Sequence, residues 1–511
     1  MKPIEKRVFV PSNLDLNHLI KMYPSSRGFI PKDYKVYGFI DLLVEVWGRQ
    51  ESHREKYGNY SFMHSKRLKY LFGDDVRPMI DWLKYAGVIE SDNHYEIGLR
   101  PKGYRLTEKY FHSPPVEKKI KKSTLIKKMK QKSPKQKKTQ SKYDYLYTFF
   151  DGLEIDKERA DLYAWDFYQN YNQEYQGLLE QYNDMISCSR FSQKSIKKPK
   201  FPISRLNYDL HQIDKIATKD FTFVQDDTSS RLHTNLTSIR SGLRDFISYK
   251  GEELVSIDFV NSQPLISSAL LSPNFFMSGD VFTSNHRAKT INTPISYDIS
   301  SNSDDMMFNC KDVAPNIYDI IQHDVATTPP IMFPEMDVST ENTSAYSYKE
   351  LCEKGELYEY LERVALPSFT SSTTLSRQEV KGMVFLMMFT SNQFIGQDAA
   401  EPKRIFRDLF PNEYKLFASI KRKDHSNLPV LLQKIESKLM YERIVPRIHE
   451  NRPDVPMFTI HDSIVTTVDN KDYVQRVMLE EMNSALGLSA KTKIEYWRSD
   501  SEKVNLVKKV A

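Results

Sequence analysis

Two short apolar runs, far apart in the chain, each end in an aspartate. Residues 254–258 read Leu-Val-Ser-Ile-Asp, and residues 457–462 read Met-Phe-Thr-Ile-His-Asp. Their β-branched and aromatic content predicts two strands. Burying an unpaired carboxylate is costly, so Asp258 and Asp462 are unsuited to a plain core, although one such residue alone would suit a turn. If the strands converge, the two side chains can form a site for Mg²⁺, which prefers oxygen ligands.

A helical pattern lies between these runs and begins at Arg377. Residues 376–379 read Ser-Arg-Gln-Glu, a capping-box pattern that places the positive end of the helix dipole at Arg377. Lys381, Phe385 and Phe389 follow at intervals of four and share one face with it. Cations and aromatic rings on one face suit an anionic substrate that carries a base. Packing in the core is the alternative for the aromatic residues.

The N-terminal region has a different pattern. Residues 66–71 and 76–86 predict two helices, the second closed by Gly87, and residues 88–90 and 103–107 predict a β-hairpin. This order resembles a winged helix. The resemblance implies that the second helix enters the major groove of DNA, while the hairpin forms the wing. A role in protein contacts or packing is the alternative.

The residues expected to bind DNA are basic and belong to the second helix or the wing. They are Arg77 and Lys84 in the helix, and Arg100 and Lys102 in the wing.

Positive charge is concentrated in one segment. Residues 118–142 hold twelve lysines and no acidic residue, whereas the whole chain has a net charge of +6. Since these lysines contribute +12, the rest of the chain carries −6. The segment has few apolar residues, so we expect a disordered linker. It also suits binding to phosphate backbones or, alternatively, nuclear targeting.

Composition narrows the class of protein. The 511 residues suffice for about three domains. No long apolar run predicts a membrane span, and the first residues lack a signal-peptide core. Cys188, Cys310 and Cys352 lie too far apart in sequence to form a CxxC pair. We therefore expect a cytoplasmic protein, or a nuclear one in a eukaryotic host, without membrane contact.

The Asp258 run, the helix that begins at Arg377 and the Asp462 run resemble motifs A, B and C, respectively, of the DNA polymerase I superfamily. This superfamily includes the phage-type single-subunit RNA polymerases. Residues 228–239, Thr-Ser-Ser-Arg-Leu-His-Thr-Asn-Leu-Thr-Ser-Ile, resemble a fourth segment of that superfamily and precede motif A as expected. The resemblance covers about residues 145 to 500. It implies an α+β right-hand polymerase with an antiparallel palm sheet, helical fingers and a helical thumb, joined to the winged-helix-like domain.

The expected organisation has three parts. They are a winged-helix-like nucleic-acid-binding domain at 1–115, a lysine-rich linker at 116–142, and a polymerase domain at 143–511 with its thumb at about 143–220, palm at 221–271 and 440–511, insertion at 272–348 and fingers at 349–439.

The resemblance also implies site roles. Asp258, Asp462 and the carbonyl of Phe259 would hold two Mg²⁺ ions, for which Mn²⁺ can substitute, and the two aspartates would be catalytic. The residues implied for the incoming nucleotide are Arg377, Lys381, Phe385, Phe389 and Gln263. Those implied for the primer-template are Arg231, Asn235, His461 and Gln433.

The sugar preference rests on three positions. Gln263 and Phe389 stand where DNA enzymes of the superfamily carry residues that block a ribose 2′-hydroxyl, and Gln263 keeps the required bulk. Ser463, however, matches the phage-type RNA polymerases. DNA synthesis from nucleoside triphosphates on primer-template DNA, with replication accessory proteins as further partners, is therefore the favoured function. The alternatives are an RNA polymerase or primase-like enzyme and a non-catalytic DNA-binding replication initiator.

Overall fold

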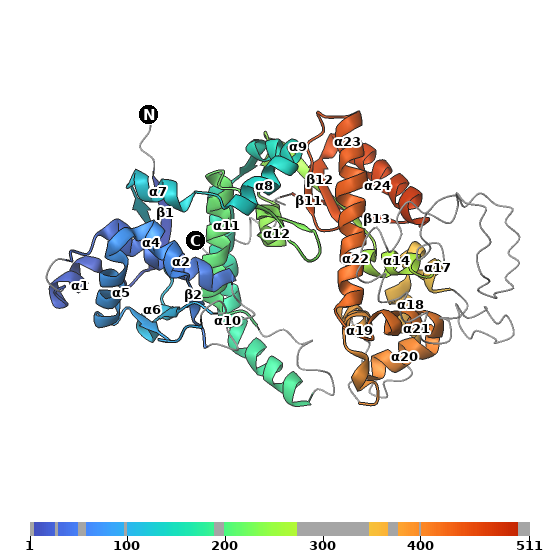
Figure 1. The fold of residues 1–511 in the computed structure, drawn as a ribbon, viewed down its shortest axis with the longest axis horizontal. Helices are drawn as coiled ribbons and strands as arrows, with labels where there is room; N and C mark the ends of the chain where they lie inside the picture. Colours follow the sequence, from blue (N-terminus) through green and yellow to red (C-terminus); the bar gives the residue numbers. More distant parts are fainter. Residues whose placement is uncertain are drawn as a thin grey trace, which may run out of the picture.

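The computed structural model describes residues 5–25, 29–49, 58–96, 100–188, 199–272, 347–365, 377–397 and 400–498. Within these ranges the chain has an α+β fold, and every paired strand is antiparallel (Figure 1). The predicted insertion falls almost entirely outside the described residues. No helix in these ranges combines the length and apolar character needed to cross a membrane.

The N-terminal elements surround their own core. They are β1 (Lys6–Pro11), α1 (Leu16–Met22), α2 (Asp33–Arg49), β2 (Ser61–Phe62), α4 (Ser65–Phe72), α5 (Val76–Tyr85), β3 (Ile89–Ser91), β4 (Gly103–Leu106), α6 (Glu108–Phe111) and β5 (Pro115–Ile120). The predicted helices are present as α4 and α5, and the predicted hairpin as β3 and β4. Strand β2 joins the hairpin in the order β2-β4-β3, while β1 pairs with β5.

The expected lysine-rich linker is folded, so that prediction is corrected. Strand β5 and helices α7 (Ser123–Met129) and α8 (Pro134–Lys142) span most of residues 116–142. The few apolar side chains of the segment are spaced to face inward: Ile120, Leu125 and Ile126 are buried in the N-terminal core. Low apolar content therefore concealed a segment that folds by packing on its neighbours.

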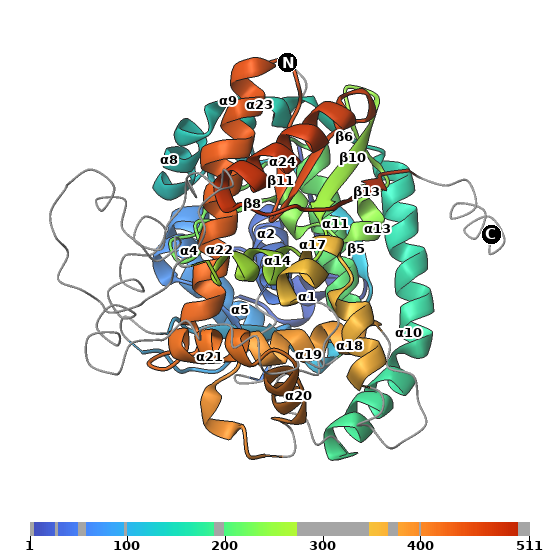
Figure 2. The ribbon, with the colours of Figure 1, turned by 90° about the vertical axis from the view of Figure 1, so that its right-hand side faces the viewer.

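A six-stranded sheet organises the C-terminal part. Its strands are β6 (Leu153–Ile155), β9 (Ile247–Tyr249), β10 (Glu252–Phe259), β11 (Phe458–Ile460), β12 (Ser463–Thr467) and β13 (Thr492–Tyr496). Strand β10 is central, because β12 and β13 pair with its two edges and β9 continues the order to β6. Helix α24 (Lys471–Leu486) packs across β10 and β12 (Figure 2).

Helices and a small hairpin complete the structure. They are α9 (Asp144–Tyr147), α10 (Lys157–Cys188), α11 (Pro202–Ala217), β7 (Phe223–Gln225), β8 (Leu232–Thr234), α12 (Asn235–Ser238), α13 (Ser241–Arg244), α14 (Ser262–Ala269), α17 (Tyr348–Lys354), α18 (Leu357–Ala365), α19 (Arg377–Phe389), α20 (Glu401–Leu409), α21 (Pro411–Ile420), α22 (Asn427–Lys438), a π-helix (Leu439–Ile444) and α23 (Val445–Asn451). Helix α22 runs from the layer of α19 to α21 up to the sheet (Figures 1 and 2).

The N-terminal part is docked directly on α11. The Asp41 carboxylate on α2 lies 2.8 Å from Nε2 of His211 and accepts a hydrogen bond from the Phe9 backbone N–H at 2.7 Å. These two ionisable side chains are 2% and 5% exposed. Arg7 adds an ion pair with Asp161 at 3.3 Å. The N-terminal part is thus packed against the C-terminal part.

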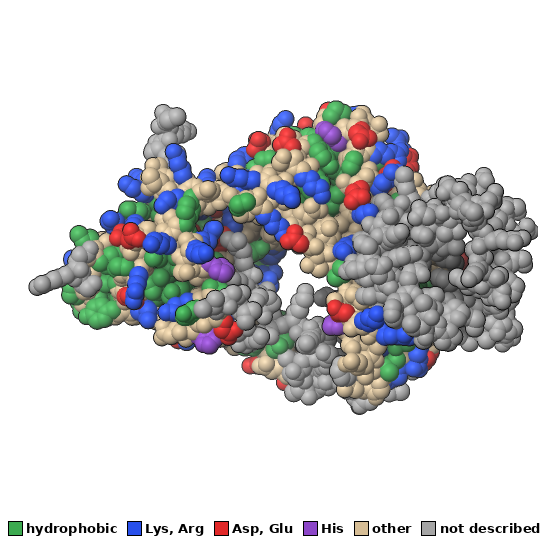
Figure 3. Space-filling model, in the orientation of Figure 1, with side chains coloured by type: hydrophobic (Ala, Val, Ile, Leu, Met, Phe, Trp, Pro, Cys, Tyr) green, Lys and Arg blue, Asp and Glu red, His purple; other side chains and the backbone are tan. Residues whose placement is uncertain are grey.

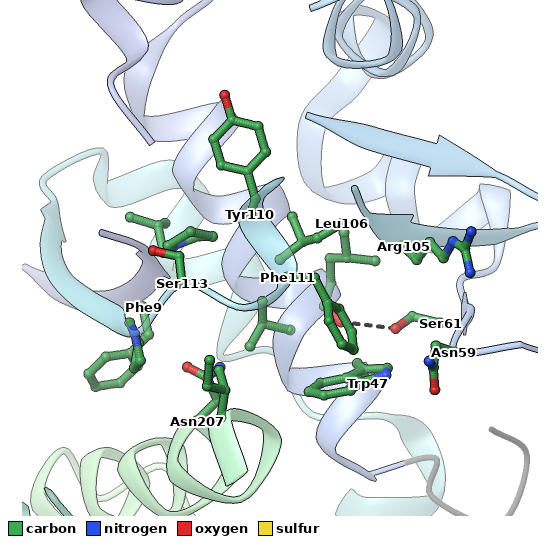
Figure 4. A pocket seen from close by; sticks show the side chains of 16 residues that line it. Phe9, Trp47, Asn59, Ser61, Arg105, Leu106, Tyr110, Phe111, Ser113 and Asn207 are labelled. Carbon is green, nitrogen blue, oxygen red and sulfur yellow. Dashed lines mark hydrogen bonds between the residues drawn. The ribbon is translucent and has the colours of Figure 1, made fainter. Parts of the chain in front are cut away.

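A small cavity lies in the same interface (Figure 4). Phe9, Trp47 and Phe111 line it from the N-terminal side, and Asn207 lines it from α11. Ser61 donates a hydrogen bond to the Leu43 carbonyl at 3.1 Å in its wall. Its mainly apolar lining is consistent with an imperfectly filled packing interface.

Candidate active site

The two predicted aspartates meet at one end of the central sheet. Asp258 pairs with Ser463, the first residue of β12, so Asp462 is the next residue along from its cross-strand neighbour. A tight turn makes this possible, because Ile460 pairs with Ser463 and leaves only His461 and Asp462 between β11 and β12. Directly opposed residues of antiparallel strands lie about 5 Å apart. Two segments far apart in sequence therefore bring their carboxylates together.

The surroundings of both carboxylates disfavour their charge. Burial raises the pKa of Asp462, and the neighbouring charge of Asp258 raises it further. Burial also raises the pKa of Asp258, although the nearby hydroxyl groups of Ser463 and Ser256 oppose this shift. The Ser256 hydroxyl also donates to Asp258, at 3.3 Å. Two buried, mutually repelling carboxylates gain from a cation held between them.

Both carboxylate segments contain a residue in the left-handed backbone region. His461 has φ of +56° in the tight turn, and Asn261 has φ of +54° where β10 gives way to α14. The Ser463 hydroxyl fixes the turn by donating to the Ile460 carbonyl at 2.8 Å. Such conformations cost about 1–3 kcal/mol each and cluster at functional sites.

The His461 imidazole is neutral at physiological pH. Burial lowers its pKa to about 4, and the positive charge of Arg231 adds to this shift. Its ring centroid lies 6.3 Å from that of His233 on β8. Its buried Nδ1 atom has no hydrogen-bond partner among the described residues. His461 is therefore placed beside the carboxylates with an unused polar atom.

Glu436 is a site residue that the sequence interpretation missed. The Arg231 guanidinium donates to Glu436 Oε1 with Nε at 2.8 Å and Nη2 at 2.6 Å, and the Gln263 amide donates to Oε2. Burial raises the pKa of Glu436 to about 7, and the charge of Asp462 raises it as well, whereas Arg231 lowers it. Glu436 thus links two predicted site residues next to the carboxylates.

A signal for Glu436 was present in the sequence. Leu432, Ile435 and Leu439 place it on an apolar face of α22, where an acidic residue needs a partner. On this helix, the sequence interpretation chose Gln433, as a primer-template residue, and not Glu436. Gln433 is half-buried on the same helix.

Asp226 shapes the loop that carries Arg231. It accepts hydrogen bonds from the Ser229 N–H at 2.6 Å and from the Arg231 N–H at 3.1 Å, and Ser230 has φ of +60°. Partial burial raises the pKa of Asp226, but the hydrogen bonds from Ser229 and others outweigh it and lower the pKa to about 2. An ionised Asp226 therefore holds Arg231 toward Glu436.

Asn235, predicted to contact the primer-template, is held inside the fold. Its side chain is 2% exposed, accepts from the Thr222 N–H at 2.6 Å and donates to the Asp220 carbonyl at 3.4 Å. Both ends of the amide are therefore occupied inside the fold. Asn235 anchors the entry to the β7–β8 hairpin.

Helix α19 begins at Arg377 as predicted, but the Arg377 side chain lies outside the described residues. The Lys381 ammonium lies 5.6 Å from the centroid of the Phe385 ring, and Phe385 stacks on Phe389 at 5.3 Å. A different face is buried, with members Val380, Val384, Met387 and Met388. The predicted stripe is therefore not the one that forms the core of this helix.

The predicted N-terminal DNA contacts differ in their surroundings. Arg77 and Lys84 are exposed on α5, and Lys102 is half-buried. Arg100 is engaged within the hairpin, because it pairs with Asp92 at 2.5 Å and lies over the Phe62 ring at 4.7 Å. Its position is that of a residue that stabilises the hairpin, and its contact with DNA stays a prediction.

The carboxylate pair fits Mg²⁺. This ion is commonly held by one or two carboxylates together with substrate phosphates and water, as Asp258 and Asp462 would allow. The Phe259 side chain is buried in the core, so only its backbone carbonyl is available to a metal. Within the described ranges, no three His, Cys, Asp or Glu side chains form a closed metal site.

The fold is similar to a solved polymerase structure. It is the POL domain of Pol1 from M. smegmatis in complex with a DNA primer-template and dNTP, with 13% sequence identity and a TM-score of 0.27. The similarity covers 68% of this chain and 67% of that one. A scan against protein families finds no match, and neither does a search of curated proteins.

Proposed function

We propose that this protein is a template-directed nucleotidyltransferase, specifically a DNA-directed DNA polymerase. The observation that carries the proposal is the meeting of Asp258 and Asp462 at the end of adjacent strands. The Arg231–Glu436–Gln263 cluster beside them adds a cation and an amide donor to the same region. This combination suits a substrate with phosphates and a sugar hydroxyl.

In the proposed reaction, two Mg²⁺ ions bound at the carboxylates would activate a 3′-hydroxyl and neutralise the charge that develops on the triphosphate. Asp258 and Asp462 would hold these ions, together with the Phe259 carbonyl. Neutral His461 and the Arg231 guanidinium would orient the end of the primer strand. Their positions are fixed by the β11–β12 turn and by Asp226.

Helix α19 is proposed to bind the incoming nucleotide. Lys381 and Arg377 would contact the triphosphate, and the stacked Phe385 and Phe389 would contact the base. The partial exposure of both rings supports this role. Helix α19 packs against α22, which also carries Glu436, so one rigid element connects the nucleotide helix to the carboxylates.

These roles also assign the palm, fingers and thumb of the proposed polymerase. The central sheet would be the palm, α19 to α22 the fingers, and α10 and α11 the thumb. The face in Figure 3 is hollowed between the N-terminal elements and the α19–α22 helices, which is consistent with room for nucleic acid. Helix α5 and the β3–β4 hairpin would form a winged-helix module that contacts DNA through Arg77, Lys84 and Lys102.

The proposed sugar preference is for deoxynucleotides. Glu436 holds the Gln263 amide in place, so the bulk that would exclude a ribose 2′-hydroxyl is fixed. RNA or primer synthesis is a second candidate because Ser463 follows Asp462 at the position that the phage-type RNA polymerases share. Primer extension separates the two.

The test is primer extension on DNA and RNA templates, with or without primer, and with dNTPs or NTPs. We expect primed extension with dNTPs, and a fall of about 10³-fold or more in single-turnover rate for Asp258→Asn and for Asp462→Asn. Asp472→Asn, at a side chain 81% exposed on α24, is the matched control and should keep the wild-type rate. Unprimed synthesis with NTPs would select the second candidate, and full activity of either aspartate variant would refute the site.

A further inference from the structure

The lysine-rich segment, residues 118–142, is folded and carries exposed basic side chains. We define the lysine face as Lys122, Lys127, Lys137 and Lys138. All four side chains are exposed; Lys122 directly precedes α7, Lys127 lies on α7, and the other two lie on α8. Basic side chains gather over these helices in the space-filling view (Figure 3). Across the described ranges, no acidic side chain forms an ion pair with any of the four. Their charge is therefore available to an outside polyanion.

Helix α8 is joined to the hairpin that carries Arg231. Lys135 pairs with Asp227 at 2.6 Å, and Lys142 donates to the Gln225 side chain at 3.1 Å. The Gln136 amide donates to the Phe221 carbonyl at 3.3 Å. Thr139, on the buried side of α8, accepts a hydrogen bond from the Gln225 N–H at 3.4 Å. Residues on both sides of β7 therefore fix α8.

This connection continues to the carboxylates. Asp227 follows Asp226, which holds the Arg231 backbone, and Arg231 pairs with Glu436 beside Asp462. Helix α8, which carries Lys137 and Lys138, is thus fixed relative to the hairpin of Arg231, whereas α7, which carries Lys127, packs on α4.

We infer that the lysine face binds the phosphate backbone of the nucleic acid whose end occupies the Asp258–Asp462 site. This inference rests on the proposed function, because it takes that nucleic acid as the ligand. A local excess of positive charge in a chain that is otherwise net negative favours a polyanion over a small anion. The face offers only point charges, so its binding is independent of sequence.

The test is a variant with Lys122, Lys127, Lys137 and Lys138 all changed to Gln. A fluorescence anisotropy titration of a labelled primer-template duplex gives Kd at several KCl concentrations, without need for catalysis. The slope of log K against log[salt] should become shallower by about 3 to 4, and Kd at 0.1 M salt should rise by about tenfold or more. The rate of single-nucleotide incorporation at saturating DNA should be unchanged.

A matched control removes the same number of charges elsewhere. Lys349, Lys423, Lys471 and Lys491, all changed to Gln, also bring the net charge from +6 to +2. The inference would be overturned if both variants lost DNA affinity equally, or if the lysine-face variant bound DNA as tightly as the wild type. Neither outcome would affect nucleotide incorporation, so the proposed function would stand. Absence of incorporation by the wild-type protein would instead remove the proposed function, and the binding comparison would still decide whether the face holds duplex DNA. The inference would also be overturned if the lysine-face variant kept its affinity for the duplex but lost binding to an acidic protein.

Discussion

At the residue scale, the site depends on acidic side chains that the fold forces into unfavourable surroundings. Asp258 and Asp462 are buried beside each other, and Glu436 is buried within reach of the Asp462 charge. The positive charge of Arg231 opposes the raised pKa values of Asp462 and Glu436, and Arg231 is held by Glu436 and Asp226. We therefore assign Glu436 a positioning role, because its carboxylate binds Arg231 and Gln263 and is not one of the proposed metal ligands.

Glu436→Gln tests this role. The change leaves Arg231, whose side chain is 20% exposed, without its ionic partner. We expect a loss of about 1–3 kcal/mol in the free energy of unfolding. Misplacement of Arg231 and Gln263 should lower the incorporation rate by about 10- to 100-fold.

Urea unfolding and single-turnover extension measure these effects. Glu442→Gln, at a side chain 58% exposed in the π-helix that follows α22, is the control and should change neither quantity. Discrimination between dNTP and NTP should also weaken in Glu436→Gln, because Gln263 loses its fixed partner. Wild-type stability and discrimination in that variant would contradict the positioning role.

At the element scale, helix α19 is held at its C-terminal end by buried lysines. The Lys421 ammonium donates to the carbonyls of Met387 at 2.7 Å and Thr390 at 3.2 Å, and Lys403 donates to the Ser391 carbonyl. Positive groups at a helix C-terminus satisfy free carbonyls and oppose the dipole. The proposed nucleotide face is therefore supported from its far end.

Lys421→Met should destabilise the protein by about 1–3 kcal/mol, because it leaves these carbonyls without a donor. Burial lowers the pKa of Lys421 to about 7, and the charge of Lys403 adds to the shift. Between pH 7 and the model-peptide value of about 10.4, Lys421 binds more protons in the unfolded chain than in the folded one, so its contribution to the stability of the wild type rises with pH.

The stability difference between wild type and Lys421→Met should therefore widen as pH rises from 7 to 9.5, by at most about 1.4 kcal/mol per pH unit. Urea unfolding at several pH values measures it. Lys423→Met, at an exposed position two residues away, should show no such trend. A difference that stays constant or narrows would contradict the assigned environment of Lys421.

At the scale of the whole molecule, the N-terminal part and the sheet-bearing part are joined through a buried polar interface. Asp41 on α2 pairs with His211 on α11, and both are almost fully inaccessible to solvent. Burial lowers the pKa of His211, but the Asp41 charge outweighs this and raises it overall. The pairing stabilises the fold fully below the unfolded histidine pKa of about 6.5, and this contribution is lost as pH rises through the folded value.

Asp41→Asn should separate the two parts. Removing one partner of a buried pair costs about 3–5 kcal/mol, since a buried charge is left uncompensated. We expect calorimetry of Asp41→Asn at pH 6 to show an additional unfolding transition at a lower temperature. Limited proteolysis should cut the variant between the N-terminal part and α10. Asp81→Asn, at an exposed position on α5, is the control. One unchanged transition in Asp41→Asn would show that the interface does not depend on this pair.

The sequence by itself determined the local elements of the site. The apolar runs before Asp258 and Asp462, the capping pattern at Arg377 and the hairpin signals near Gly87 depend on neighbouring residues, and each element formed where expected. The lysine-rich segment was misjudged because its stability comes from Leu125 and Ile126 reaching a distant core. Local composition does not contain that contact.

Only the tertiary structure decided which side chains share the site. Strand register placed Asp462 next to the residue opposite Asp258, and helix packing brought Glu436 to Arg231 and Gln263. Tertiary contacts also engage Asn235 with Thr222 and Arg100 with Asp92. Pairing, burial and charge coupling depend on distances between residues remote in the chain, and those distances are fixed only when the whole chain has folded.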